Sequence, residues 1–285
     1  MRVGVIDVGS NTTRLLVASA GPDAVVPLAK EKVRLSLGEE IERYGSVSDV
    51  HVAAAAKAVR KMADVARGHG VESLDVFLTA PGRQASNAQE LVSALTRAAG
   101  VPARVLSKDE EGTLAYRGAV LTCDVALPSR IAVCDVGGAS TEIAVGRPVD
   151  GPDWITSVDL GSVRLTARAD DLDDAKDEAS DELAHVAPPA VEAALAVGGS
   201  ARAARKLVGP ELGEKELAEA LRLVETKSPR QLTRGYGVDR ARAEILGAGI
   251  VLLAEVQRKL GVPLHVCSGG IREGAVLASA EALAA

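Results

Sequence analysis

Short apolar runs that end on polar or glycine-containing turns predict an α/β fold for this chain of 285 residues. The first run, residues 3–6, ends on Asp7, and a second apolar run follows the turn at 8–11. This spacing predicts a strand, a turn and a second strand. Helical patterns then alternate with apolar runs, and we expect helices at about 49–68, 83–99 and 108–120 and strands at 74–79 and 103–106.

The opening pattern returns in the middle of the chain. Residues 4–17 read GVIDVGSNTTRLLV and residues 132–145 read AVCDVGGASTEIAV, an offset of 128 (residue 132 against residue 4). Six residues keep this offset, namely Val5, Asp7, Val8, Gly9, Thr13 and Val17, which recur as Val133, Asp135, Val136, Gly137, Thr141 and Val145. The repeat predicts two copies of one α/β unit, with the two Asp-Val-Gly turns facing each other across a cleft.

The second half continues the alternation of strands and helices. Strands are predicted near 154–159, 195–197 and 264–267, and helices at about 239–260 and 272–284. Residues 146–153 are expected to form a loop, since glycine, proline and aspartate cluster there. The acidic stretch 170–182 is interpreted as the solvated face of a helix.

Charge and aromatic content narrow the classes of ligand. A net charge of -6 and an aromatic content of 2% argue against nucleic acid and anionic membranes as partners, so a polyanion would need a local basic pocket. We expect no membrane span and no secretory leader, and Cys123, Cys134 and Cys267 form no CxxC pair. These features favour a reduced, cytoplasmic location. The four histidines are scattered and predict no metal site.

Both Asp-Val-Gly turns have the composition of a phosphate-binding loop. Successive backbone N–H groups in a glycine turn hold phosphate oxygens, and neighbouring hydroxyl and amide groups add donors. The candidate phosphate ligands are Gly9, Ser10, Asn11, Thr12 and Arg14 in the first copy and Gly137, Gly138, Ser140 and Thr141 in the second. The carboxylates Asp7, Asp135 and Glu142 would face Mg²⁺, with Mn²⁺ as the alternative ion. For one copy alone, a hairpin turn that binds nothing is the alternative.

Two adjacent glutamates begin the predicted helix at 108–120. Ser107 and Glu110 have the spacing of a capping box, in which the glutamate reaches back to the serine N–H. Glu111 has no such local duty and is therefore the better candidate for a catalytic base. Two solvated glutamates favoured by the helix dipole are the alternative interpretation.

Two other helix starts carry candidate anion ligands. Arg83 and Asn87 lie four residues apart and share a face, and a guanidinium can grip phosphate with two parallel hydrogen bonds. Gly199 and Ser200 open a later helix, whose N-terminus favours anions. A solvated surface arginine and a glycine turn required for packing are the respective alternatives. Basic residues between 227 and 242 either line a polyanion groove or are simply solvated.

These motifs together resemble the exopolyphosphatase/guanosine pentaphosphatase (Ppx/GppA) family, part of the actin-like superfamily. DVGSNTTRLLV looks like the family's D-x-G-S-N-S-x-R-L, and DVGGASTEIAVG looks like its D-x-G-G-G-S-T-E. TAPGRQASN at 79–87, SKDEEGTLAYRGA at 107–119, GSVRLT at 161–166 and REG at 272–274 also fit in order. Thr12, Lys108 and Ala139 depart from the family pattern. The chain resembles the short, two-domain branch of the family.

The resemblance implies two ribonuclease-H-like α/β domains, at residues 1–121 and 122–285, with a helix at about 272–285 that packs back on the first. It implies Mg²⁺-dependent hydrolysis of the terminal phosphoanhydride of inorganic polyphosphate, with Glu111 as base and Arg83 as a cation on the transferred group. A one-residue slip would make Glu110 the base. Guanosine pentaphosphate hydrolysis, regulatory binding of guanosine alarmones and phosphoryl transfer to ADP stay open as alternatives, as does a homodimer.

Overall fold

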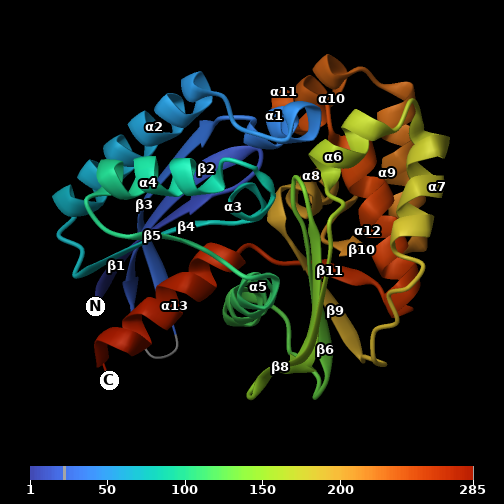
Figure 1. The fold of residues 1–285 in the computed structure, drawn as a ribbon. Coiled ribbons are helices and arrows are strands. Elements are labelled where there is room, and N and C mark those ends of the chain that lie inside the picture. Colours follow the sequence, from blue (N-terminus) through green and yellow to red (C-terminus); the bar gives the residue numbers. More distant parts are fainter. Residues whose placement is uncertain (22–23, 285) are drawn as a thin grey trace.

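Two mixed β-sheets stand side by side in the computed structural model, which describes residues 1–21 and 24–284 (Figure 1). The first sheet has the strand order β3-β2-β1-β4-β5. Its strands are β1 (Arg2–Val8), β2 (Thr12–Ala20), β3 (Val25–Arg34), β4 (Ser73–Leu78) and β5 (Ala103–Val105). The central strand β1 pairs antiparallel with β2 and parallel with β4. Its apolar run is therefore buried on both faces, as a continuous apolar strand requires.

The second sheet repeats this arrangement, with the order β10-β11-β9-β6-β7-β8. Its strands are β6 (Ile131–Val136), β7 (Thr141–Arg147), β8 (Gly151–Val158), β9 (Ala193–Val197), β10 (Glu211–Leu212) and β11 (Leu264–Val266). Strand β6 pairs antiparallel with β7 and parallel with β9, as β1 does with β2 and β4. The sequence repeat thus corresponds to a repeat of sheet topology.

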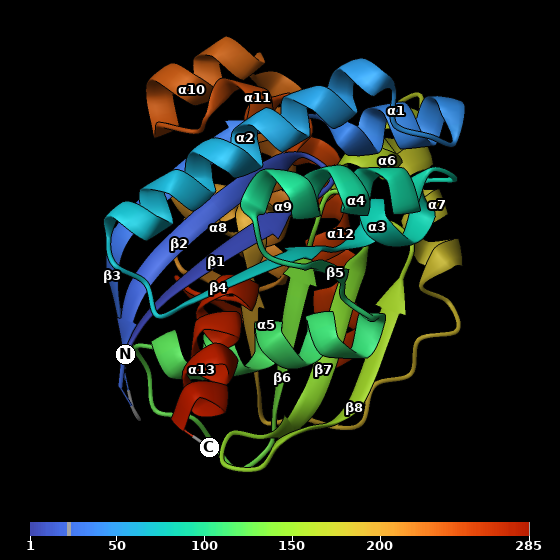
Figure 2. The ribbon, with the colours of Figure 1, turned by 60° about the vertical axis from the view of Figure 1, so that its left-hand side comes forward.

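Helices cover the outer face of each sheet, and others lie between the two sheets (Figures 1 and 2). They are α1 (Leu37–Tyr44), α2 (Asp49–Gly68), α3 (Ala80–Gln84), α4 (Ala88–Ala99), α5 (Lys108–Thr122), α6 (Ser162–Arg168), α7 (Leu172–Glu182), α8 (Gly198–Val208), α9 (Glu214–Thr226), α10 (Pro229–Tyr236), α11 (Arg240–Ala243), α12 (Leu246–Leu260) and α13 (Ile271–Ala284). Among the described residues, no helix combines the length and apolarity needed to cross a membrane.

Several predicted elements differ from the observed ones. The helix predicted at 83–99 is two helices, because Ala85 has an extended backbone between α3 and α4. The helix predicted at 239–260 is broken between α11 and α12. Strand β3 was not predicted, and it is an edge strand whose residues are exposed or half-buried. Helix α7 does cover the acidic stretch, and it buries Ala175 and Ala179 as predicted for a solvated helix.

Helices α5 and α13 pack against each other where the chain passes between the sheets (Figure 2). Helix α5 lies on β6, β7 and β8, and α13 lies on β1 and β2. The two helix backbones approach so closely that a Cβ on Gly118 would overlap the carbonyl oxygen of Gly270. Glycine is therefore required at this crossing. The division of the chain at residue 121 stays a prediction.

Candidate active site

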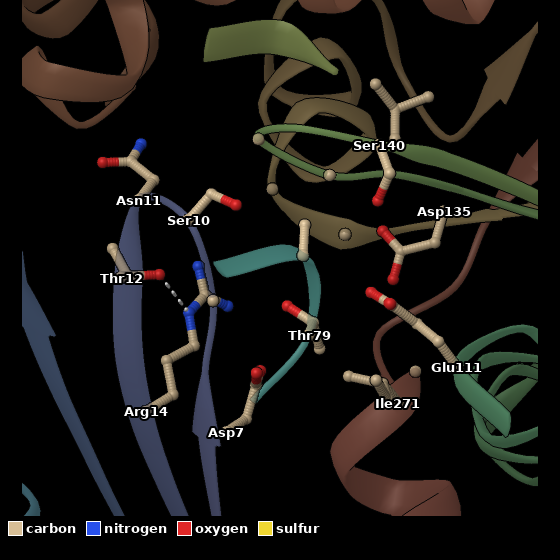
Figure 3. A pocket seen from close by; sticks show the side chains of 18 of the residues that line it. Asp7, Ser10, Asn11, Thr12, Arg14, Thr79, Glu111, Asp135, Ser140 and Ile271 are labelled. Carbon is tan, nitrogen blue, oxygen red and sulfur yellow. Dashed lines mark hydrogen bonds between the residues drawn. The ribbon is translucent and has the colours of Figure 1, made fainter. Parts of the chain in front are cut away.

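A cleft lies between the sheets at the turns that follow β1 and β6 (Figure 3). The two turns face each other and touch, since a Cβ on Gly138 would lie 3.2 Å from the Cβ of Ser10. The predicted residues that line this cleft are Asp7, Gly9, Ser10, Asn11, Thr12, Arg14, Glu111, Asp135, Gly137, Gly138, Ser140 and Gly199. Residues far apart in the sequence thus meet at one site.

The two turns share their main-chain hydrogen bonds. In the first turn the N–H of Gly9 donates to the carbonyl of Thr12 (3.2 Å), and in the second the N–H of Gly137 donates to the carbonyl of Ser140 (3.0 Å). The carbonyls of the intervening residues Ser10 and Gly138 each accept a 2.8 Å bond from the start of the helix that follows the third strand, α1 or α6. The repeat is therefore conserved to the level of individual hydrogen bonds.

Three carboxylates gather on the side of the second turn. Asp135 and Glu142 are opposite residues of β6 and β7. Glu111, in the first turn of α5, directs its carboxylate toward that of Asp135 (Figure 3). Ser157 donates a 2.8 Å hydrogen bond to Oε1 of Glu142, whose side chain is almost completely buried. Three acidic groups are thus held close together away from bulk water.

Burial and mutual repulsion shift the pKa values of these acids upward. Burial, followed by the charge of Asp135, raises the pKa of Glu142 to about 7. Burial, followed by the charge of Glu142, raises the pKa of Glu111 well above its usual range, against the opposing charge of Arg83. Burial also raises the pKa of Asp135, and that of Asp7 to about 6. Such shifts are typical of functional sites, where charged groups are brought together for a task.

These acids fit a hard divalent cation. Asp135 and Glu111, which line the cleft, and the buried Glu142, which does not, offer oxygen ligands alone. Oxygen is the donor type that Mg²⁺ prefers. A cation among them would remove the repulsion that raises their pKa values. Asp7 is a less obvious ligand, because Arg14 is its partner across the β1–β2 pair. The role of each as a metal ligand stays a prediction.

Arg83 does not line the cleft, but it forms an ion pair with Glu111, which does. Its Nη1 donates to Oε2 of Glu111 (2.7 Å) and to the carbonyl of Leu106 (2.9 Å). Its Nε and Nη2 atoms are buried and have no hydrogen-bond partner among the described residues. The pairing leaves Oε1 of Glu111 without a hydrogen bond to Arg83, while the guanidinium keeps the carboxylate oriented.

Four arginines also line the cleft, namely Arg14, Arg202, Arg242 and Arg272. Burial, followed by the charge of Arg14, lowers the pKa of both Arg202 and Arg242 to about 10. Buried cations that repel one another in this way favour an anionic ligand. The sequence indicated Arg242 only as one of several basic residues, and it gave no reason to single out Arg202. Its position near the start of α8, four residues after Gly198, was the available signal.

Three predicted phosphate ligands do not line the cleft, and each has a hydrogen-bond partner within the protein. Both ends of the Asn87 amide bond the main chain of Val47 (2.8 and 3.0 Å). Thr141 donates to the carbonyl of Leu160 (2.7 Å). The hydroxyl of Ser200 lies 3.5 Å from Nη1 of Arg242, which lines the cleft. A phosphate contact by Asn87 or Thr141 would first have to break these bonds.

Glu110 forms the predicted capping box. Its N–H donates to Oγ of Ser107 (3.1 Å), and its Oε2 accepts from the N–H of Ser107 (2.8 Å). Its carboxylate also pairs with Arg104 at 3.1 Å, on the exposed surface. The structure therefore separates the two adjacent glutamates, with Glu111 in the cleft and Glu110 outside its lining.

Comparison with known proteins identifies the family. The model of the Ppx/GppA phosphatase family matches residues 16–283. This chain belongs to the Ppx/GppA phosphatase family. Exopolyphosphatase 1 of Mycobacterium tuberculosis is 30% identical over 306 residues, which cover 97% of this chain and 88% of the relative. Exopolyphosphatase 1 of Mycobacterium leprae is 28% identical over 306 residues, with 97% and 89% covered.

Solved structures confirm the predicted fold of two α/β domains of the actin-like type. The Aquifex aeolicus member of the Ppx/GppA family superimposes with a TM-score of 0.83 at 21% identity, covering 99% of this chain and 98% of that one. An exopolyphosphatase from Cytophaga hutchinsonii gives a TM-score of 0.86 at 19% identity, with 99% and 98% covered. At these identities the likeness establishes the fold alone.

Proposed function

We propose that this protein is an exopolyphosphatase, which hydrolyses the terminal phosphoanhydride of inorganic polyphosphate with the help of Mg²⁺. One observation carries the proposal: Glu111, paired with Arg83, faces Asp135 of the second turn inside a cleft that four arginines also line. The names of the curated relatives support this substrate.

The two turns would bind the terminal phosphates through backbone N–H groups and hydroxyls. Gly9, Ser10 and Asn11 face the ligand from the first sheet, and Gly138 and Ser140 from the second. When bound, Mg²⁺ would supply positive charge to the phosphate oxygens, with Asp135 and Glu142 as its main protein ligands. The arginines would neutralise the remaining charge of the chain.

Glu111 would orient the attacking water and accept its proton at Oε1, because Oε2 already accepts a hydrogen bond from Arg83. The water oxygen bonds to the terminal phosphorus while the bond from that phosphorus to the bridging oxygen breaks. The bridging oxygen leaves on the shortened chain, and orthophosphate is released. Burial raises the pKa of Glu111, which strengthens it as a base, and the charge of Arg83 opposes this shift.

The test is release of orthophosphate from polyphosphate of defined lengths with Mg²⁺, with Mn²⁺ and with EDTA. We expect Glu111→Gln to lower kcat by about 10²–10⁴-fold, since that is the usual contribution of a general base. The matched control is Glu110→Gln, which removes the neighbouring carboxylate from the capping box and should cost stability while leaving most of the activity. If Glu110→Gln lost activity and Glu111→Gln kept it, Glu110 would be the base.

Parallel assays on guanosine pentaphosphate, and on polyphosphate with ADP, separate the other phosphoryl-transfer reactions. Release of orthophosphate from polyphosphate without ADP supports the proposal. If orthophosphate is released from guanosine pentaphosphate and not from polyphosphate, guanosine pentaphosphate is the substrate. No release from either compound, in protein that is folded and monodisperse, would overturn the assignment as a hydrolase.

A further inference from the structure

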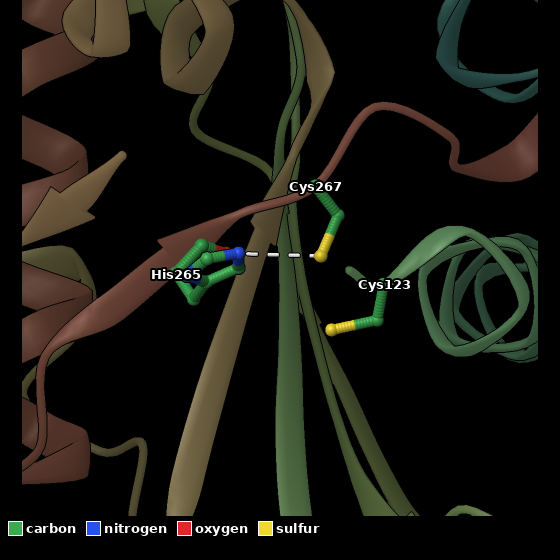
Figure 4. Close-up of side chains that lie close together, drawn as sticks. All are labelled: Cys123, His265 and Cys267. Atoms are coloured by element: carbon green, nitrogen blue, oxygen red, sulfur yellow. Dashed lines mark hydrogen bonds between the residues drawn. The ribbon is translucent and has the colours of Figure 1, made fainter. Parts of the chain in front are cut away.

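A second cluster of ligand-type side chains lies away from the cleft, where the chain passes between the sheets. Cys123, His265 and Cys267 come together there, with one potential ligand atom from each within 4.8 Å of the others (Figure 4). Cys123 ends α5, the helix that leads from the first sheet to the second. His265 and Cys267 lie on and just after β11, before the chain returns to the first sheet as α13. None of the three lines the cleft.

We propose that this cluster binds a zinc ion through Cys123, Cys267 and the Nε2 atom of His265. Two thiolates and an imidazole are the ligands that zinc prefers, in tetrahedral geometry. With zinc–sulfur bonds of about 2.3 Å and zinc–nitrogen bonds of about 2.0 Å, ligand atoms stand about 3.5–3.8 Å apart. The ligand atoms lie within 4.8 Å of one another, so side-chain movements on the order of 1 Å bring them to these distances.

Two carboxylates flank His265. Glu211, its partner across the β10–β11 pair, accepts from Nδ1, which orients the ring with Nε2 directed away from Glu211. Asp124 lies 2.7 Å from Nε2, so its carboxylate has to move aside when an ion binds that atom. Its side chain is 68% exposed, so an ion can reach the cluster from the surface. A carboxylate behind a ligating imidazole is the usual support of zinc sites.

A bound ion would join the two segments that connect the sheets. The same segments already meet through Thr122, whose hydroxyl accepts a 2.9 Å hydrogen bond from the N–H of Gly269. Zinc would add a second and stronger link between the end of α5 and the start of the α13 connection. We therefore expect it to raise the thermal unfolding midpoint, since a ligand that binds only the folded state stabilises it.

The test uses the whole protein, reduced and stripped of metal, then titrated with Zn²⁺ or with Co²⁺ as a coloured substitute. We expect one tightly bound ion per chain, an upward shift of the unfolding midpoint, and a thiolate-to-cobalt charge-transfer band. This band reports sulfur ligands and so distinguishes the cluster from the oxygen ligands of the cleft.

Three variants sharpen the test. Cys123→Ser, at a half-buried position, should abolish the band. Glu211→Gln should weaken Zn²⁺ affinity by about 10–100-fold, because it removes the group that supports the ligating histidine. Cys134→Ala removes the third cysteine and should leave the band unchanged. Binding without a charge-transfer band, an unchanged band in Cys123→Ser, or no uptake of metal by the folded protein would each overturn the proposal.

Discussion

The hairpins β1–β2 and β6–β7 share a turn geometry but carry opposite chemistry at one cross-strand pair. Asp7 faces Arg14 in the first hairpin, and Asp135 faces Glu142 in the second. The first pair combines opposite charges, whereas the second combines two buried acids. The duplicated fold thus presents one side suited to anions and one suited to a cation, which together match a phosphate chain and its metal.

The largest expected effect comes from removing a carboxylate on the cation side. We expect Asp135→Asn to lower kcat by more than about 100-fold, because replacing even a group that supports a metal ligand costs 10–100-fold. Asp7→Asn should cost less, since Asp7 is paired with Arg14. The measurement is orthophosphate release against Mg²⁺ concentration. Equal losses in both variants would contradict the division of roles between the hairpins.

A smaller effect is expected from moving the Asp135 carboxylate without removing it. Gly198 has φ +89°, and a Cβ there would overlap Oδ1 of Asp135. Gly198→Ala should therefore lower kcat by up to about 100-fold, the effect of a displacement of about 1 Å. Gly209→Ala is the matched control, since Gly209 has φ +99° with open space around it. If Gly209→Ala reduced kcat equally, backbone strain and not Asp135 would be the cause.

On the anion side, Arg14→Gln tests binding of the substrate. Arg14 lines the cleft, and its Nε donates to Oγ1 of Thr12 (3.1 Å). Loss of a charged hydrogen bond costs about 1.5 kcal/mol or more, so KM for polyphosphate should rise about tenfold with a smaller change in kcat. The KM of the variant should also depend less on salt concentration than the KM of the parent protein. A selective fall in kcat would instead place Arg14 among the groups that act in the transition state.

The smallest effect concerns a contact between α1 of the first half and α6 of the second. Glu42 of α1 accepts hydrogen bonds from Arg164 (2.6 Å) and Arg168 (2.7 Å) of α6. Burial alone would raise the pKa of Glu42, but these bonds outweigh it and lower the pKa below 4.5. The stabilisation is therefore complete above the ordinary pKa and is lost as pH falls through the lowered one.

Near neutral pH, Glu42→Gln should lower the free energy of unfolding by about 1 kcal/mol. The difference in free energy of unfolding between variant and parent should become smaller as the solution is acidified below about pH 4.5. Denaturant unfolding at a series of pH values measures it. Glu178→Gln is the control, since it removes a 3.1 Å pair with Arg168 inside the second half. A gap that widens in acid would rule out an ionised Glu42 as the stabilising group.

Much of the site could be predicted because it depends on local sequence. Residues within a few positions of one another predict the two turns and the capping box at Ser107. The same local pattern leaves Glu111 outside the capping box. The pairing of Arg83 with Asn87 fails because it assumed one helix, whereas the extended Ala85 separates α3 from α4. Arg83 turns to Glu111 and Asn87 turns to the main chain of Val47.

The sequence by itself determined the repeat, the family and the chemical character of each turn, since these depend on residue order and spacing. Only the tertiary structure brought Arg202 and Arg272 to the cleft and Cys123 to His265, because those contacts join elements that are far apart in the sequence. Such contacts depend on how the helices between the sheets pack, and no local pattern encodes that packing. The scattered cysteines and histidines predicted no metal site, and packing alone placed three of them together.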